Sequence, residues 1–169
     1  MNPWKCERWK KYYSGKERHK GLSVHYSHET DPMLKTFLSD FARWLRENYH
    51  FPVSVDVYVM SDAQICAMDG DMVSATFFGP YDREDQPYIR IAAGDFYGLS
   101  AAYGRFSALC STAASLAHEL THYYQWLNDL KLSVRTEEKQ AEKYSEKIVY
   151  EYLYDRGYDL AEELEKQDI

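Results

Sequence analysis

Two long segments of this chain repeat their apolar residues every three to four positions, which is the spacing of a helix with one buried face. The first segment covers residues 33–49. Asp31 suits the N-cap of that helix, and Pro32 suits its first turn. The second segment covers residues 106–128 and contains no Gly or Pro. We therefore predict two amphipathic helices, each of which packs its apolar side into the core.

Three shorter segments between these helices have the pattern of β-strands. In residues 53–59, valine alternates strictly with other residues, which predicts a strand with one buried face. Residues 72–78 and 88–93 are mostly apolar, with β-branched and aromatic side chains, and predict two more strands. Residues 94–104 are rich in Gly and Ala and are expected to form a connection. We therefore expect a small sheet of three or more strands.

A further helix is predicted after a short polar break at residues 128–129. We expect it to begin near Thr136, which suits an N-cap, and to stop before Gly157. Residues 159–166 predict a short last helix. The order of helix, three strands, helix and helix favours an α+β fold in which the sheet packs on the helix of residues 106–128.

Composition and charge favour one domain preceded by an N-terminal arm. The chain has 169 residues, of which 45% are hydrophobic, and we place the domain at residues 31–169. Residues 1–30 are expected to form a basic, aromatic arm, because residues 1–20 contain seven Lys or Arg and two Glu, whereas the whole chain has a net charge of −7. Basic residues among aromatic ones can bind nucleic acid. Because the rest of the chain is acidic and carries no nucleic-acid motif, we expect the arm to pack its aromatic residues on the domain instead.

Targeting signals and cysteine usage bear on where the protein resides. No apolar run approaches the length of a membrane span, and the first residues lack the apolar region of a signal peptide. Cys6, Cys66 and Cys110 are odd in number, lie far apart and lack CxxC spacing, so they do not suggest a disulfide framework. We therefore expect a protein without a membrane span in the reducing cytoplasm.

The strongest chemical signal is the sequence His118-Glu119-Leu120-Thr121-His122 in the second long helix. Side chains four residues apart lie on one side of a helix, so His118 and His122 can direct two imidazole nitrogens to one point, as a tetrahedral zinc ion requires. Glu119 lies beside them, where it can act as a base on water rather than as a ligand. A helix that merely carries two surface histidines and a glutamate is the alternative explanation.

A third ligand can come from the helix that follows. One side of that helix carries Glu138 and Glu142 together with small residues, which allow it to pack closely against the helix of His118 and His122. A carboxylate on this side could reach the metal. No histidine follows His122, so a third histidine ligand shortly after the motif is excluded.

The segment HELTHYYQW, followed by a helix with the pattern Glu-x-x-Ala-Glu, resembles the gluzincin-type zinc metallopeptidases. It is most similar to small phage and bacterial proteins of this type, including ImmA/IrrE-like peptidases and minigluzincins. The resemblance extends over residues 107–154. It implies a minimal zincin-like fold in which His118, His122 and Glu138 bind Zn²⁺, Glu119 is the general base and Glu142 orients a ligand histidine.

Two parts of this resemblance leave alternatives. The interval from His122 to Glu138 is short beside many gluzincins, so Glu142 and, after it, Glu137 are rival third ligands. The layout also resembles the minimal zincin core, in which a strand at the edge of the sheet lies above the metal and pairs with an extended substrate. Residues 88–93 are our prediction for that edge strand, and an ordinary interior strand is the alternative.

The resemblance predicts a zinc-dependent metalloendopeptidase that hydrolyses peptide bonds in a peptide or protein substrate. A regulatory peptidase that cuts a single partner protein would use the same chemistry. A zinc-stabilised regulatory or interaction protein, of the kind associated with phages or mobile elements, would keep the ligands without needing Glu119. Binding of nucleic acid through the arm is a further alternative, which the acidic composition disfavours.

Overall fold

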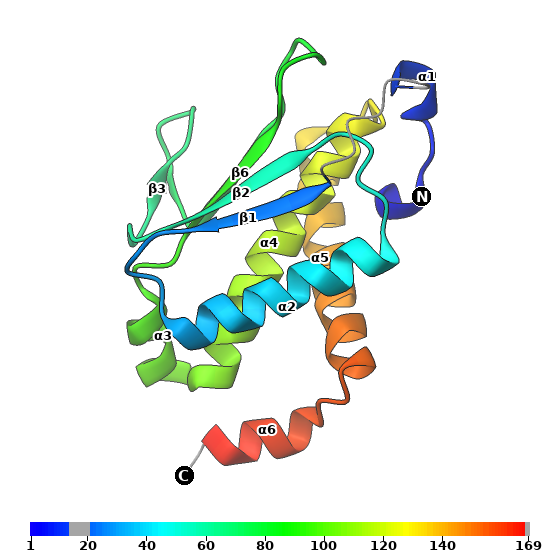
Figure 1. Cartoon of the computed structure of the whole chain (residues 1–169). Helices are drawn as coiled ribbons and strands as arrows, with labels where there is room; N and C mark the ends of the chain where they lie inside the picture. Colours follow the sequence, from blue (N-terminus) through cyan, green and yellow to red (C-terminus); the bar gives the residue numbers. More distant parts are fainter. Residues whose placement is uncertain (14–20, 168–169) are drawn as a thin grey trace.

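The structure, a computed structural model, describes residues 1–13 and 21–167 and has an α+β architecture in which a small mixed sheet packs against long helices (Figure 1). The strands are β1 (Leu22–Tyr26), β2 (Val55–Met60), β3 (Ile65–Cys66), β4 (Met72–Val73), β5 (Ala75–Phe78) and β6 (Tyr88–Ala92). The helices are α1 (Lys10–Tyr13), α2 (Pro32–Asn48), α3 (Phe96–Tyr103), α4 (Arg105–Leu127), α5 (Val134–Asp155) and α6 (Leu160–Gln167), and a 3-10 turn, η1 (Pro3–Lys5), precedes them.

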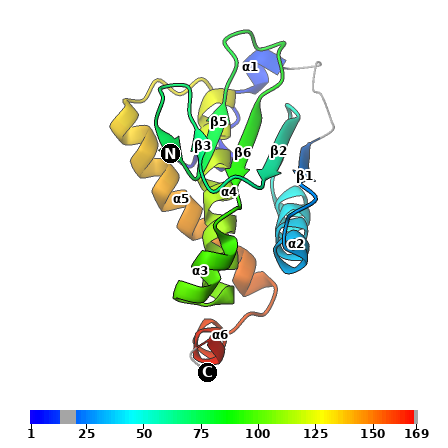
Figure 2. The same ribbon diagram turned by 90° about the vertical axis from the view of Figure 1, so that its left-hand side faces the viewer.

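The main sheet has the strand order β1-β2-β6-β5, and β3 and β4 form a separate two-stranded hairpin. β2 runs parallel to its neighbours β1 and β6, whereas β5 pairs with β6 in the antiparallel direction. Helix α2 contacts β1, and α4 contacts β6 and β5, so both helices lie on the same side of the sheet (Figure 2). The inward residues of β2 and β6 form the centre of the core: Val55, Val57, Val59, Ile89 and Ile91.

The position of β6 corrects one prediction. Because β6 lies between β2 and β5, the expectation that residues 88–93 form the edge of the sheet is wrong. Ile89 and Ile91 are buried, since β6 is paired on both sides and α4 covers it. The edge strand above α4 is β5 instead. The predicted strand of residues 72–78 divides at Ser74, where β4 leaves to pair with β3 and β5 begins to pair with β6.

The N-terminal region takes a larger part in the fold than an arm of residues 1–30 would. β1 belongs to the main sheet, with Leu22 opposite Val55 and buried, so the domain includes residues before position 31. Farther upstream, Trp4, Trp9 and Tyr13 are buried in the core, while the lysines between them are exposed. This packing agrees with the expected role of the aromatic residues. Residues 14–20 of the predicted arm lie outside the described residues.

Local capping explains where the helices begin and end. The Asp31 carboxylate accepts two backbone N–H groups of the first turn of α2, so its role as N-cap is confirmed. The N-cap of α5 is Ser133 and not Thr136, because the Ser133 hydroxyl accepts the Thr136 N–H. Gly157, with a φ of 78°, follows the end of α5 as predicted. Helix α3 occupies residues that the sequence predicted only as a connection.

Candidate metal centre

Helices α4 and α5 form a hairpin that brings the candidate ligands together. The connection between them covers residues 128–133. Ala141 of α5 is fully buried, and its small side chain lets α5 lie close to α4. Leu116 and Leu120 of α4 are fully buried in the core, whereas His118 and His122 turn toward Glu138 of α5.

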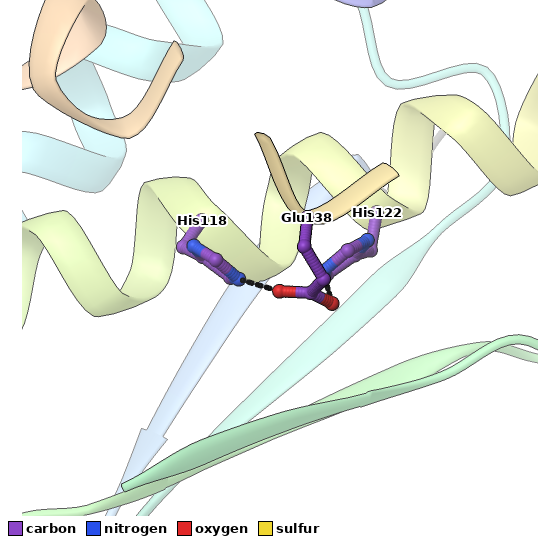
Figure 3. A group of neighbouring side chains, drawn as sticks. All are labelled: His118, His122 and Glu138. Carbon is purple, nitrogen blue, oxygen red and sulfur yellow. Dashed lines mark hydrogen bonds and ion pairs between the residues drawn. The ribbon is translucent and has the colours of Figure 1, made fainter. Parts of the chain in front are cut away.

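His118, His122 and Glu138 converge on one point (Figure 3). The Nε2 atom of His118 is 3.2 Å from Oε2 of Glu138, and Nε2 of His122 is 3.1 Å from Oε1 of the same carboxylate. One ligand atom from each residue lies within 4.8 Å of the other two. Among the His, Cys, Asp and Glu residues in the described ranges 1–13 and 21–167, these three form the group whose geometry suits a metal ion.

The surroundings of His118 favour its neutral form. Burial, and then the charge of His122, lower the pKa of His118, and the carboxylates of Glu138 and Glu142 oppose this shift. A neutral imidazole is the form that binds a metal. Glu142 lies one turn beyond Glu138, is exposed, and acts on His118 through its charge. The structure therefore brings Glu138 to the two histidines, rather than Glu142 or Glu137.

The second nitrogen of His122 is held by Gln125, which lies three residues farther along α4. Nδ1 of His122 is 2.8 Å from Oε1 of Gln125. Nε2 of Gln125 donates to the backbone C=O of Glu137 at 3.1 Å, and because that carbonyl can only accept, the amide must turn its oxygen toward His122. Nδ1 therefore carries the proton, and Nε2 is the nitrogen with an electron pair available to a ligand site beside Glu138.

Glu119 is buried next to this group. Its residue is 8% exposed, and desolvation raises its pKa to about 7, although the charge of His122 and a hydrogen bond from the Phe77 backbone N–H favour the ionised form. A carboxyl group with a pKa near neutrality can take up and release a proton under physiological conditions. Because Phe77 belongs to β5, the Glu119 side chain extends from α4 to this strand.

The register of β5 turns part of its backbone toward Glu119. The Ala92 N–H donates to the Ser74 C=O at 2.8 Å, so residues 74, 76 and 78 are the ones that exchange hydrogen bonds with β6. Alternation along the strand directs the backbone groups of Ala75 and Phe77 away from β6. The hydrogen bond from the Phe77 N–H to Glu119 agrees with this register.

A cleft runs along α4 past the three converging residues. Its larger part has a volume of about 630 Å³ and lies between β5, the hairpin of β3 and β4, and the start of α5. Aromatic, apolar and acidic side chains line it: Phe77, Trp126, Leu130, Asp69 and Glu137. A second part of about 360 Å³ lies toward the start of α4 and is lined by small residues: Ser74, Ala75, Ser111, Ala114, Ser115 and Ser145. The two parts share Ala75, His118 and Glu119, and they differ in size and in the kind of side chains that line them.

Two contributors to the site were not predicted from the sequence. Gln125 lies three positions after His122, a spacing that places two side chains side by side on a helix, so the sequence did contain a signal for it. The backbone N–H of Phe77 had no such signal, because its direction depends on how β5 pairs with β6.

Two imidazole nitrogens and one carboxylate oxygen form a donor set that could hold a divalent transition-metal ion. The set does not close around the ion position, since the side chain of Glu138 is 56% exposed toward the cleft. Such an open set of three protein ligands is typical of catalytic rather than structural sites.

Comparisons of the chain with protein-family models, with curated proteins and with solved structures gave no match. The geometry of the site therefore carries the interpretation. In the part of the chain that the structure describes, no helix combines the length and the apolar composition that a membrane crossing requires.

Proposed function

We propose that the chain is a zinc-dependent metallopeptidase with a minimal zincin-like fold. The observation that carries the proposal is the convergence of His118, His122 and Glu138 within 4.8 Å, with Glu119 buried beside them. A surface helix that carried these residues by chance would not bring a carboxylate from a second helix to both imidazoles. It would also not bury the adjacent glutamate under a strand.

His118, His122 and Glu138 are the residues that would hold the ion. The nitrogen and oxygen donor set suits Zn²⁺ better than a soft or an oxygen-preferring metal. Bound zinc supplies Lewis acidity, which polarises a substrate carbonyl and lowers the pKa of water to about 7 in well-studied enzymes. The exposed side of Glu138 leaves room in the cleft for substrate.

Glu119 has the position and the surroundings of a general base. It would remove a proton from the attacking water and deliver this proton to the amine that leaves when the peptide bond breaks. Its burial keeps it from bulk water, and the hydrogen bond from the Phe77 N–H restrains its direction. The same residue therefore serves as base and then as acid.

β5 supplies a surface for an extended peptide. Ala75 and Phe77 turn their backbone groups away from β6, and both residues line the cleft that passes the ligand group. An extended chain can bind such an edge through backbone hydrogen bonds, which fix its direction without demanding one particular sequence. This role falls to β5, which of the two edge strands of the main sheet is the one beside the cleft.

A second candidate is a zinc-stabilised interaction protein without proteolytic activity. It is favoured by one observation: the three ligands join α4 to α5, so that an ion would cross-link the hairpin whether or not any reaction followed. The two candidates differ in Glu119, which only the peptidase needs.

Elemental analysis of purified protein supplied with zinc tests the proposal first. Wild type is expected to hold one zinc ion, which Glu138→Ala loses and Glu142→Ala retains. Cleavage of a mixed peptide library then separates the two candidates, with Glu119→Gln as the control that keeps zinc and loses activity. If wild type binds no zinc, the metallopeptidase is refuted. If wild type binds zinc and cleaves no more than Glu119→Gln, the interaction protein is the better interpretation.

A further inference from the structure

Gln125 is connected through Gln140 to the first residue of the chain. Nε2 of Gln125 donates to Oε1 of Gln140 at 2.9 Å, and Nε2 of Gln140 donates to the backbone C=O of Met1 at 3.2 Å. The Tyr144 hydroxyl lies 3.5 Å from the same carbonyl. A hydrogen-bonded path therefore leads from His122 through two amides to the N-terminal segment.

The donors and acceptors of this path have one consistent direction. A backbone carbonyl can only accept, so Met1 orients the Gln140 amide with its nitrogen toward the start of the chain and its oxygen toward Gln125. Gln125 must then donate to Gln140, as it also does to the carbonyl of Glu137. Because Nε2 of Gln125 donates both of these hydrogen bonds, its Oε1 atom is the one that faces Nδ1 of His122.

The end of the path is anchored on the motif helix itself. Trp4 is 4% exposed, and its Nε1 donates to the Thr121 hydroxyl at 3.0 Å, one position before His122. The side chain of Asn128 contacts the backbone C=O of Pro3 at 3.4 Å. Because the Met1 carbonyl contacts Gln140 and Tyr144, the start of the chain also lies beside α5 (Figure 2). The Met1 carbonyl is thus held in place by residues on both sides of the candidate ligand.

We propose that Gln125 is a positioning residue for His122, and that Gln140 and the Met1 carbonyl help the Glu137 carbonyl to hold Gln125 in its orientation, so that the N-terminal segment contributes to the metal affinity of the site. This inference rests on the metal site proposed above. Gln125 is 4% exposed, so water does not readily replace it as the partner of Nδ1. Removal of a hydrogen-bond partner from a ligand histidine typically weakens metal binding by about 10–100-fold.

Zinc affinity of the full-length protein, measured by competition with a chromophoric chelator, tests the path. Gln125→Met is expected to bind zinc about 10–100-fold more weakly than wild type. Gln140→Met should lose less zinc affinity than Gln125→Met, because the Glu137 carbonyl still accepts a hydrogen bond from Gln125 and holds its orientation. The double variant should bind no more weakly than Gln125→Met, because Gln140 acts through Gln125. Gln167→Met is the matched control, since it loses hydrogen bonds to Ser107 near the start of α4 and should keep the wild-type affinity.

NMR of the zinc-loaded protein gives a readout that general loosening of the fold would not produce. The Nδ1 proton of His122 should be protected from exchange in wild type and in Gln125→Glu, which keeps an acceptor oxygen, and should lose its protection in Gln125→Met. Gln125→Glu should also restore most of the affinity. The inference is overturned if Gln125→Met binds zinc like wild type, if Gln125→Glu is as weak as Gln125→Met, or if the losses of the two methionine variants add. If wild type binds no zinc, both this inference and the proposed function fail, whereas a normal affinity of Gln125→Met defeats this inference alone.

Discussion

Replacing Tyr123 by phenylalanine removes one hydroxyl group from the centre of the core, where α4 meets the chain just before β2. Tyr123 is fully buried, and its hydroxyl donates to the backbone C=O of Val53 at 2.5 Å. The same oxygen lies 3.3 Å from the Val53 N–H, which donates to it. Phenylalanine keeps the ring and its contacts with Phe51 and Tyr124, so the substitution isolates the two hydrogen bonds.

The expected cost follows from the burial of both partners. Val53 is 2% exposed, so its N–H and C=O cannot turn to water when the hydroxyl is absent. A buried backbone group without a partner costs about 1–3 kcal/mol. Two such groups on one residue should lower the free energy of unfolding by about 2–4 kcal/mol, with some relaxation of the chain included. At a denaturant dependence of about 2 kcal/mol per molar urea, the midpoint should fall by about 1–2 M.

Urea unfolding followed by tryptophan fluorescence measures this midpoint. Tyr150→Phe is the matched control, because Tyr150 is 59% exposed and its substitution should change the free energy of unfolding by less than about 0.5 kcal/mol. If Tyr123→Phe unfolds at the same urea concentration as Tyr150→Phe, the hydroxyl does not join α4 to Val53 in the way the contacts indicate.

Three other substitutions test separate features. Asp31→Ala should cost about 1 kcal/mol of unfolding free energy at neutral pH. Burial opposes ionisation of Asp31, but the backbone hydrogen bonds, the Tyr97 hydroxyl and the charge of Arg105 together outweigh it and lower the pKa of Asp31. In urea titrations the difference from wild type should therefore be present above the ordinary pKa of a carboxyl group and disappear as the pH falls through the lowered value. Gly79→Ala would place a Cβ atom 2.7 Å from Cδ1 of Trp126, so it should cost about 1–3 kcal/mol and change the tryptophan emission spectrum; an unchanged spectrum and midpoint would contradict the close contact. Trp4→Phe loses the hydrogen bond to Thr121 and should lower the unfolding free energy by about 1–3 kcal/mol in urea titrations, and a wild-type midpoint would show that this bond does not anchor the N-terminal segment.

Features that depend on neighbours in the sequence could be predicted without the structure. The N-cap at Asp31 needs only the first turn of α2, and the stop at Gly157 needs only a residue that tolerates a positive φ. The convergence of His118 and His122 needs only the repeat of the helix. Glu138 was predicted as the third member of the group from the resemblance, and the packing of α5 on α4 brings its carboxylate to both histidines.

Features that depend on distant pairing could not be predicted in this way. Nothing within residues 88–93 distinguishes an interior strand from an edge strand, because both faces and both neighbours are supplied by other parts of the chain. β1 is a different case, because Leu22, Val24 and Tyr26 alternate with Ser23 and His25, which is a pattern typical of a strand. This strand was not predicted, although the sequence contained a signal for it; only its pairing with β2 depends on a distant part of the chain. The Phe77 N–H points to Glu119 only because β5 pairs with β6 through its other residues.

The distribution of the site along the chain has a consequence for how it assembles. His118, His122 and Glu138 all lie on one helical hairpin with a short connection, so they can meet as soon as α4 and α5 pair, at little cost in chain entropy. The strand that covers Glu119 comes from much farther upstream and must dock separately. On the proposed function, an incompletely folded chain can already capture its metal, whereas hydrolysis has to wait until the sheet has closed over the base. On that proposal, a newly made chain would bind its metal ion before it could cleave other proteins.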